Sequence, residues 1–166
     1  THALLERQRR LAPGTKLLFC PTPYCGRMAG RTAESRYLRH LGTHLDPAVH
    51  VLWTGPEIVS ETIAPEDLRD VSDVLRRPPL IWDNLFANDY DLRRLYLGPY
   101  AGRPSSLRGA VSGVLLNPNC EFAANHLPLA TFAEWIARAD YSPALAHARA
   151  RETWRAEWRC LGADGA

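Results

Sequence analysis

Short apolar runs alternate along the chain with amphipathic segments. The runs occupy residues 16–24 (KLLFCPTPY), 49–56 (VHVLWTGP), 79–84 (PLIWDN) and 109–119 (GAVSGVLLNPN). Each run is nearly continuous in apolar residues, which is typical of a strand that is covered on both faces. Successive runs begin about thirty residues apart, which is the spacing of consecutive βα units. The pattern therefore predicts an α/β fold with four parallel strands.

The segments between the runs have the period of helices that pack on one side. Between the first two runs, Leu38, Leu41 and Leu45 recur at spacings of three and four residues. Further along, Pro65 opens a segment with acidic residues in its first turn and arginines in its last, the order that the helix dipole favours. We predict helices in four segments: 2–12, 31–45, 64–77 and 129–139.

The segment before the fourth run has a different composition. Residues 91–109 contain Gly98, Pro99, Gly102 and Pro104. Because glycine and proline both disfavour a helix interior, we predict that this segment does not form one regular helix.

The last part of the chain is predicted to form a separate helix. Ser142 has the hydroxyl group of an N-cap residue, and Trp154 and Trp158 lie four residues apart, so they share one helix face. We expect this face to pack on the rest of the chain. The predicted division is residues 1–140, which hold the four units, and residues 141–166, which form a C-terminal helix and tail.

Composition and charge exclude several classes of protein. Apolar residues make up 46% of the chain and charged residues 23%, which is ordinary for a globular domain. The net charge is only +2 and the arginines are scattered, so we predict no nucleic-acid partner. No apolar run approaches the roughly 20 residues of a membrane span, so we predict no membrane partner. The chain starts at Thr1 without a methionine, so we expect a fragment or a processed product, and the compartment stays open with a lean to the cytoplasm.

The cysteines and histidines lack the spacing of a metal site. The chain has four cysteines: Cys20, Cys25, Cys120 and Cys160. They contain no C-x-x-C pair, so we expect buried free thiols. His40 and His44 have the spacing of helical ligands, but Gly42 lies between them and no third ligand is near. We predict no metal and no other cofactor.

Polar, aromatic and turn residues follow each apolar run. They are Tyr24-Cys25-Gly26, Trp53-Thr54-Gly55, Asp83-Asn84 and Asn117-Pro118-Asn119. These are the carboxyl ends of the predicted strands, where ligands bind both in an open doubly wound sheet and in an eight-stranded barrel. Each cluster alone is also ordinary turn or capping chemistry. Aromatic rings beside Asp and Asn suit a sugar, which has an apolar ring face and many hydroxyls, so carbohydrate is the leading ligand class.

The same stretches carry a family resemblance. LLFCPTPYCG, VLWTGPEIVS, IWDNLFANDYD, LYLGPYAGR and GVLLNPNCEFAAN resemble the second half of the catalytic barrel of the O-GlcNAcase and hyaluronidase-like glycoside hydrolases of family 84. The resemblance runs from about residue 16 to about residue 136. It implies a (β/α)8 TIM barrel to which this chain supplies about four units, strands five to eight. It also implies hydrolysis of β-linked N-acetylglucosamine, in eukaryotic-type members from serine and threonine of proteins.

The resemblance implies a substrate-assisted reaction and assigns residues to it. In this family the 2-acetamido oxygen of the substrate attacks the anomeric carbon, and water opens the resulting oxazoline; related enzymes are known exceptions to the usual nucleophilic carboxylate. Tyr24 and Trp82 match positions that line the acetamido pocket, with Cys20 beside them. Asn84 matches an amide near the acetamido group and the reacting centre.

Further positions match the family in the same motifs. Asp89 and Asn117 match residues that hydrogen-bond the sugar hydroxyls. Tyr90 and Asp91 belong to the motif of Asp89, and we assign them a supporting role only.

The sequence departs from the family at the catalytic carboxylates. The family's adjacent Asp-Asp pair lies at the end of the fourth strand, and this chain contains no Asp-Asp. Neither Asp83 nor Asp89 has the matching position. We therefore predict that this chain has no catalytic carboxylate, that the pair lies upstream of Thr1, and that the isolated chain hydrolyses little or no substrate.

Partners follow from the same hypothesis. A half barrel exposes strand edges and apolar surface, so we expect a second copy or a complementing half-barrel, besides an N-acetylglucosamine-bearing glycoconjugate such as an O-GlcNAc-modified protein. Three hypotheses stay open. The first is an O-GlcNAcase-like hydrolase, with a hyaluronidase-like preference as a variant. The second is a non-catalytic or partner-completed glycan-binding relative, and the third is an open-sheet domain that binds another polar small molecule.

Overall fold

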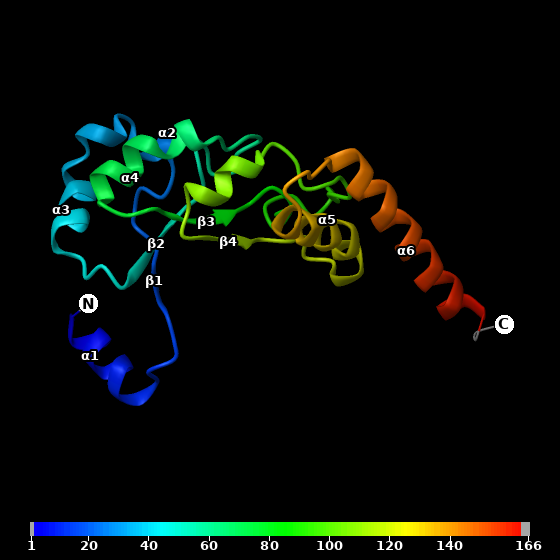
Figure 1. The fold of residues 1–166 in the computed structure, drawn as a ribbon, viewed down its shortest axis with the longest axis horizontal. Coiled ribbons are helices and arrows are strands. Elements are labelled where there is room, and N and C mark those ends of the chain that lie inside the picture. The colour runs from blue at the N-terminus through cyan, green and yellow to red at the C-terminus, as the bar shows by residue number, and fades with distance from the viewer. Residues whose placement is uncertain (1, 164–166) are drawn as a thin grey trace. The chain divides into compact units, whose positions relative to one another are not determined.

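The structure is a computed structural model that describes the backbone of residues 2–163 and the side chains of residues 3–156. Four strands form one sheet in the order β1 (Leu17–Phe19), β2 (Val49–Trp53), β3 (Leu80–Asp83) and β4 (Gly113–Leu116) (Figure 1). β1 pairs with β2 and β2 pairs with β3 in parallel, with Leu17 opposite Val49 and Leu52 opposite Leu80. The four strands lie within the four apolar runs, so the predicted α/β arrangement is confirmed.

Helices occupy the segments between the strands and the C-terminal region. They are α1 (His2–Leu11), α2 (Gly26–Ala29), α3 (Arg36–His44), α4 (Arg69–Leu75), α5 (His126–Ala137) and α6 (Pro143–Ala163), with short 3-10 turns η1 (Thr32–Glu34), η2 (Pro65–Leu68), η3 (Ser105–Gly109) and η4 (Phe122–Asn125). The five predicted helices are confirmed as α1, α3, α4, α5 and α6. Residues 91–104 contain no helix, as their glycines and prolines predict.

Two of the predicted helical segments are divided. The segment 31–45 begins with η1, and α3 starts only after Ser35, whose Oγ accepts a hydrogen bond from the backbone N–H of Leu38 at 3.3 Å. This is N-cap geometry, which satisfies one of the backbone donors at the start of a helix. The segment 64–77 likewise begins with η2 before it continues as α4. A local hydrogen bond therefore sets where α3 begins.

The chain divides into two compact units. The first contains the residues up to Asp83 together with Ser106–Leu115, and the second contains Asn84–Ser105 and the residues from Leu116 onward. Backbone positions within each unit contact one another more than they contact the other unit. The predicted boundary after residue 140 stays a prediction.

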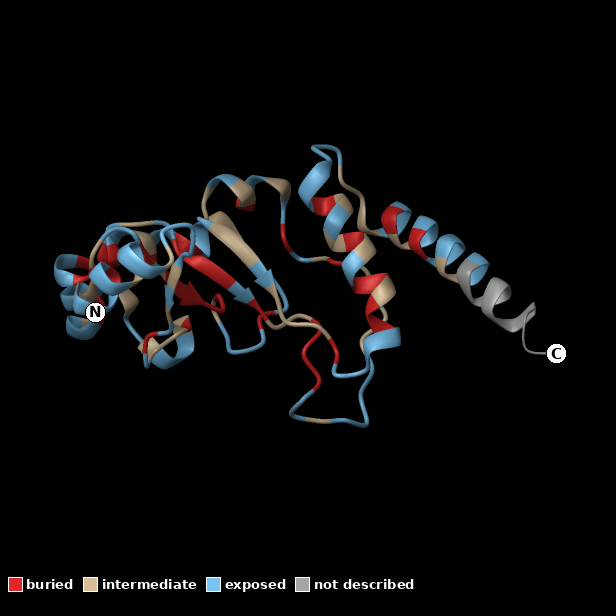
Figure 2. Cartoon of the chain, turned by 90° about the horizontal axis from the view of Figure 1, so that it is seen from below, coloured by how far each residue is buried: buried red, intermediate tan, exposed pale blue. Residues whose placement is uncertain are grey.

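The core of the first unit lies between the sheet and helices α3 and α4. The consecutive residues Val51, Leu52 and Trp53 of β2 are buried, and Leu38 of α3 and Leu75 of α4 are buried too (buried residues are red in Figure 2). Strand residues buried in succession match a strand that is covered on both faces. This packing fixes the carboxyl end of β2, where the loops of the candidate site begin.

Gly42 is the point of closest approach between α3 and α4. A Cβ atom at this position would lie 2.9 Å from Cα of Leu75 and closer still to the carbonyl oxygen of Val74. Backbone atoms cannot move aside as a flexible side chain can. The two helices therefore pack at this distance because residue 42 has no side chain.

Replacing Gly42 with Ala should destabilise the protein. In an exposed helix the same change stabilises by about 1 kcal/mol, whereas here we expect a loss of about 1–3 kcal/mol from overpacking. Urea unfolding measures the free energy, with Thr43→Ala on the exposed side of the same helix as control. A gain in stability for Gly42→Ala would show that α3 and α4 do not approach closely in solution.

The second unit is organised around aromatic side chains. Tyr100 is fully buried, and its ring meets the rings of Phe132 and Trp135 edge-on at centroid distances of 4.9 and 5.1 Å. Trp135 Nε1 donates to the carbonyl oxygen of Arg103 at 2.8 Å, and the Tyr141 hydroxyl donates to the carbonyl oxygen of Tyr100 at 2.6 Å. Desolvation raises the pKa of Tyr141 to about 12, so its hydroxyl stays protonated as a donor. The irregular segment before β4 is thereby fixed to α5.

Helix α6 packs with one face. Ala146 and Ala150 are buried, and Arg149 forms an ion pair with Glu134 of α5. Trp154, on the predicted packing face, is half-buried, and the side chain of Trp158 lies outside the described residues. Within residues 2–163 we find no helix that combines the length and the hydropathy of a membrane span.

The cysteines differ from the expectation of buried thiols. Cys25 is a buried free thiol, as predicted, but Cys20 and Cys120 are exposed, so the prediction was wrong for these two. Cys20 directly follows β1, and Cys120 lies in the loop after β4. Neither position faces a core, which explains their exposure. The Cys160 side chain lies outside the described residues. The described part of the chain also has no group of three or more His, Cys, Asp or Glu residues arranged to hold a metal ion.

Candidate functional site

The loop after β1 is held by the loop after β2. The carbonyl oxygen of Tyr24 accepts a hydrogen bond from the backbone N–H of Thr54 at 2.8 Å, and the Gly26 N–H donates to the carbonyl oxygen of Gly55 at 2.9 Å. A Cβ atom on Gly26 would lie 3.1 Å from the carbonyl oxygen of Pro56, so the loops approach closely. These bonds fix the backbone of Tyr24, whose side chain is half-buried.

The loop after β2 is closed by a serine that the sequence analysis did not single out. Ser60 Oγ donates to the carbonyl oxygen of Thr54 at 2.9 Å and accepts from the N–H of Glu57 at 3.0 Å. Gly55 has a φ of +98°, which favours glycine, and a Cβ there would lie 2.7 Å from Ser60 Oγ. Ser60 and Gly55 together maintain the turn that holds Tyr24.

Cys20, the predicted neighbour of the acetamido pocket, lies directly after β1. Its Sγ donates weakly to the carbonyl oxygen of Pro21 at 3.7 Å. Desolvation by neighbouring atoms raises the pKa of the Cys20 thiol. The thiol therefore stays protonated near neutral pH, so it acts as a small polarizable side chain and not as a nucleophile.

Trp82 is the residue of β3 that faces outward. Its side chain is 40% exposed, whereas Ile81 and Asp83 on either side are fully buried. Because successive side chains of a strand point to opposite faces, this alternation leaves the indole open to a ligand. Asp83 is closed off from solvent.

Asn84 and Asn117 are joined by a direct hydrogen bond. Asn84 follows β3, Asn117 follows β4, and Asn117 Nδ2 donates to Asn84 Oδ1 at 3.0 Å. Both residues are half-buried. The bond occupies one donor of Asn117, and no described residue donates a hydrogen bond to its Oδ1. The sequence predicted both residues for the site, and the fold brings their side chains together.

The motif of Asp89 divides into one open side chain and two that are occupied. Asp89 is exposed and has no partner among the described residues. The Tyr90 and Tyr96 hydroxyls share a hydrogen bond of 2.7 Å, which raises the pKa of Tyr90. Asp91 pairs with Arg93 at 2.9 Å, and this hydrogen bond holds the pKa of its carboxyl group below the usual value. Tyr90 and Asp91 therefore stabilise their own loop.

Three buried amides near these residues were not among the predicted site residues, although Asn119 belongs to the polar cluster after the fourth run. Asn88 and Asn119 are buried and bond to backbone groups of the loops around them, and Asn125 bonds to Asn119. The only sequence signal is position, because Asn88 precedes Asp89 and Asn119 closely follows Asn117. Which amide turns inward depends on partners far along the chain.

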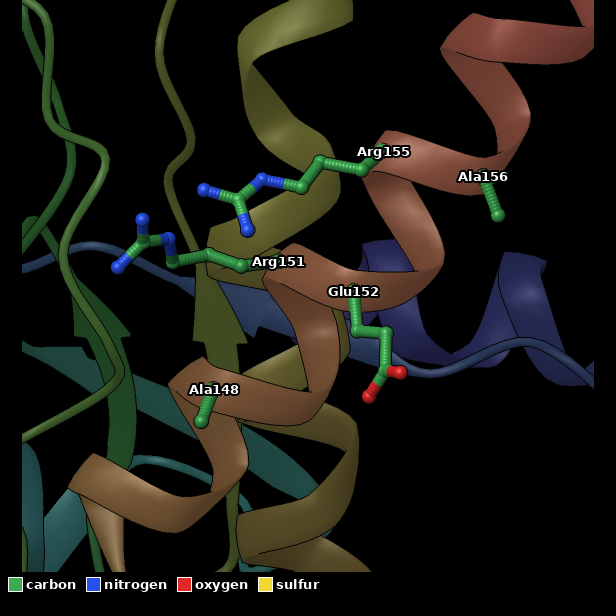
Figure 3. Close-up of a pocket in the computed structure, with 5 residues that line it drawn as sticks. All are labelled: Ala148, Arg151, Glu152, Arg155 and Ala156. Carbon is green, nitrogen blue, oxygen red and sulfur yellow. The ribbon is translucent and has the colours of Figure 1, made fainter.

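A shallow hollow on α6 lies apart from the predicted site residues. It is lined by Ala148, Arg151, Glu152, Arg155 and Ala156, and the side chains of Arg151 and Arg155 extend in the same direction (Figure 3). It contains none of the residues that the sequence predicted, so it is not the candidate site.

Comparisons with known proteins identify relatives of the chain. The protein O-GlcNAcases of Mus musculus and Rattus norvegicus are each 51% identical to it over 119 residues, which cover 71% of this chain and 13% of each relative. The chain thus spans about an eighth of the length of these curated relatives.

Solved structures match the fold of the chain. An O-GlcNAc hydrolase variant from Thermobaculum terrenum superposes with a TM-score of 0.84 and 32% identity, covering 92% of this chain and 32% of that one. The protein CpGH84B superposes with a TM-score of 0.81 and 25% identity, covering 91% and 28%. Both are TIM-barrel enzymes of family 84, so the predicted fold class is confirmed.

A family profile gives the broadest match. The beta-N-acetylglucosaminidase family matches residues 2–162, nearly the whole chain. The match includes every strand and each predicted site residue. On this evidence the chain belongs to the β-N-acetylglucosaminidase family of glycoside hydrolases, family 84.

Proposed function

We propose that the protein containing this chain is a β-N-acetylglucosaminidase that hydrolyses β-linked N-acetylglucosamine, with O-GlcNAc-modified protein as the substrate class. In this proposal the chain supplies the sugar-binding part of the site. Tyr24 and Trp82 enclose the acetamido group with Cys20 beside them, Asn84 lies near the reacting centre, and Asp89 and Asn117 bind sugar hydroxyls. The family membership and the identity to two protein O-GlcNAcases support the proposal.

The observation that carries the proposal is the hydrogen bond of 3.0 Å from Asn117 Nδ2 to Asn84 Oδ1. A carboxamide has both a donor and an acceptor, so a neighbour that fixes one end orients the other. With its Nδ2 engaged, Asn117 presents its Oδ1 as an acceptor for a sugar O–H. Such preorganisation lowers the entropic cost of holding a flexible ligand in a reactive geometry.

The proposed reaction uses the substrate as its own nucleophile. The acetamido oxygen attacks the anomeric carbon, the C–O bond to the leaving group breaks, and a general acid protonates the leaving oxygen. Water then opens the oxazoline. The reaction needs one carboxylic acid for this proton and a second carboxylate that accepts the acetamido N–H. We propose that both are an Asp-Asp pair outside this chain, and that no cofactor takes part.

The isolated chain should hydrolyse a fluorogenic β-N-acetylglucosaminide at no more than the background rate. The full-length protein, with the upstream segment that we expect to end a strand in Asp-Asp, should hydrolyse it. General acid catalysis and orientation together contribute many orders of magnitude, so the difference should be at least about 1,000-fold. Initial rates measured on both proteins at equal concentration provide the test.

Each other outcome favours a different hypothesis. Full-length protein that binds N-acetylglucosamine but does not cleave the substrate would identify a non-catalytic glycan-binding relative. Full-length protein that neither binds nor cleaves would reject the proposal. Activity of the isolated chain that rises more steeply than its concentration would indicate a site completed by a second copy, and would reject the assignment of both carboxylates to a segment outside this chain.

A further inference from the structure

The second unit contains a buried cluster of polar side chains next to the predicted sugar-binding residues. We call the buried residues Asn88, Asn119 and Asn125, together with the carboxylate of the exposed residue Glu121, the amide network. Asn88 is 0% exposed, Asn119 3% and Asn125 6%. A buried carboxamide without partners destabilises the folded state, so a cluster of three requires a compensating set of hydrogen bonds.

Asn88 joins two segments that are distant in the sequence. Its Nδ2 donates to the carbonyl oxygen of Arg94 at 2.8 Å and to Glu121 Oε2 at 2.7 Å. Its Oδ1 accepts from the backbone N–H of Cys120 at 2.8 Å. Both amide hydrogens and the oxygen are therefore in use. Asn88 fastens the segment after β3 to the loop after β4.

Asn119 and Asn125 make a second connection. Asn119 Oδ1 accepts from the backbone N–H of Tyr96 at 2.9 Å, and Asn119 Nδ2 donates to the carbonyl oxygen of Tyr96 at 3.0 Å. Asn125 Oδ1 accepts from the N–H of Asn119 at 2.8 Å, and Asn125 Nδ2 donates to the carbonyl oxygen of Asn119 at 2.8 Å. The side chain of Asn119 is thus held by the backbone of Tyr96, and the backbone of Asn119 is held by the side chain of Asn125.

The network lies beside two predicted ligands of the sugar. Asn88 is the residue before Asp89, and Asn119 is two residues after Asn117. Asn88 and Asn119 face inward, whereas Asp89 is exposed and Asn117 half-buried. A fully satisfied buried network permits one arrangement of the backbone around it, because a shifted loop would leave several polar groups unpaired. An apolar core of equal volume would not fix the loops so uniquely.

We propose that the amide network is a positioning device that holds Asp89 and Asn117 at the geometry needed to bind the sugar hydroxyls. The proposal rests on the proposed function for the roles of Asp89 and Asn117. Asn88, Asn119, Asn125 and Glu121 do not touch the substrate in this assignment. They act through the two loops that they tie together.

Replacing Asn88 with Ala in the full-length protein tests the proposal. We expect kcat/KM to fall about 10- to 100-fold, because misplaced binding groups act on every bound substrate molecule. The loss should appear mainly in KM, since hydroxyl contacts are made in both the ground state and the transition state. A merely structural role would lower the folded fraction and hence kcat, with KM unchanged.

Thr131→Val is the matched control for burial and stability. Thr131 is fully buried in the same unit, and its Oγ1 accepts from the N–H of Tyr100 at 3.0 Å, but it does not join the amide network. This variant should lose stability with an unchanged KM. An equal rise of KM in Thr131→Val and Asn88→Ala would overturn the proposal.

Glu121 offers a milder test if Asn88→Ala does not fold. Its carboxylate accepts from Asn88 although the residue itself is exposed, so Glu121→Ala removes one bond without opening the core. We expect KM to rise about three- to tenfold, the effect of one hydrogen bond. Glu121→Gln keeps an oxygen acceptor and should restore a KM near that of the unmodified protein. No difference between the Ala and Gln variants would contradict the proposal.

A structural readout separates this proposal from the proposed function. In ¹⁵N spectra, the side-chain amide signal of Asn117 should shift in Glu121→Ala and stay in place in Thr131→Val. If the unmodified full-length protein neither binds nor cleaves the sugar, the proposed function fails while this shift still tests the network. An Asn117 signal that does not respond to Glu121→Ala overturns the positioning role regardless of activity.

Discussion

Asn117→Ala in the full-length protein should lower kcat/KM for an aryl β-N-acetylglucosaminide about 100-fold with little loss of stability. The change removes the acceptor proposed for a sugar hydroxyl and also the donor to Asn84 Oδ1 at 3.0 Å. Without this donor Asn84, which the proposal places near the reacting centre, loses a bond that orients it, and disturbing one preorganised polar group there commonly reduces the rate by about 10²–10³. Asn117 is only half-buried, so its removal leaves no large cavity.

A double-mutant cycle tests whether Asn84 and Asn117 act together. Residues in direct hydrogen-bond contact couple by about 0.5–3 kcal/mol, so Asn84→Ala and Asn117→Ala combined should lose less activity than the sum of the single losses. Gln8→Ala is the control, since among the described residues the Gln8 side chain bonds only to the carbonyl oxygens of Ala12 and Thr15 and to Thr15 Oγ1. Strictly additive losses, or full activity of Asn117→Ala, would reject the pair as part of the site.

The strands could be predicted because burial on both faces leaves a visible mark in the sequence. β2 (Val49–Trp53) starts at the first residue of its apolar run. β1 ends at Phe19 although its run continues to residue 24, because Pro21 and Pro23 cannot donate ladder hydrogen bonds. β4 begins at Gly113, since η3 takes up residue 109 of the predicted run. Apolar content locates a strand, and its ends depend on which backbone groups can pair.

The sequence indicated which types of residue would line the candidate site, but it did not show which individual side chain would be open to a ligand and which would be buried. The sequence treats Asn117-Pro118-Asn119 as one polar cluster at a strand end. The structure separates its two amides, with Asn117 half-buried beside Asn84 and Asn119 buried against Asn125 and the backbone of Tyr96. Two of these contacts, Asn117 with Asn84 and Asn119 with Tyr96, join residues more than twenty positions apart. No local pattern in the sequence contains that information.

For Asp91, by contrast, the sequence does contain the information about its partners. Its place in the motif with Asp89 suggested a supporting part in ligand binding. In the structure its carboxylate is occupied by Arg93 and Arg94, at 2.9 and 3.2 Å. These partners are its near neighbours in the sequence, so the ion pairs could have been anticipated from charge pattern alone. Asp89, with no such partner among the described residues, is the carboxylate of the motif that stays open to a ligand.

Trp135→Ala should produce the largest loss of stability among single substitutions in the second unit. Trp135 is almost fully buried, stacks on Phe132 at a centroid distance of 6.0 Å and donates its Nε1–H to the carbonyl oxygen of Arg103. Removing a buried indole leaves a cavity and breaks the hydrogen bond to Arg103, so we expect a loss of about 3–5 kcal/mol. Urea unfolding followed by circular dichroism gives the free energy of unfolding.

Phe122→Ala is the matched control for this substitution. Phe122 is also an aromatic residue of the second unit, but it is 93% exposed, so its truncation should hardly move the unfolding midpoint. The contrast tests the packing and not the residue type. If both variants unfold at the same urea concentration as the unmodified protein, the aromatic cluster around Tyr100 is not the core of this unit. The α5–α6 region would then owe its stability to the Glu134–Arg149 ion pair and the alanine face of α6, which bury far less apolar surface.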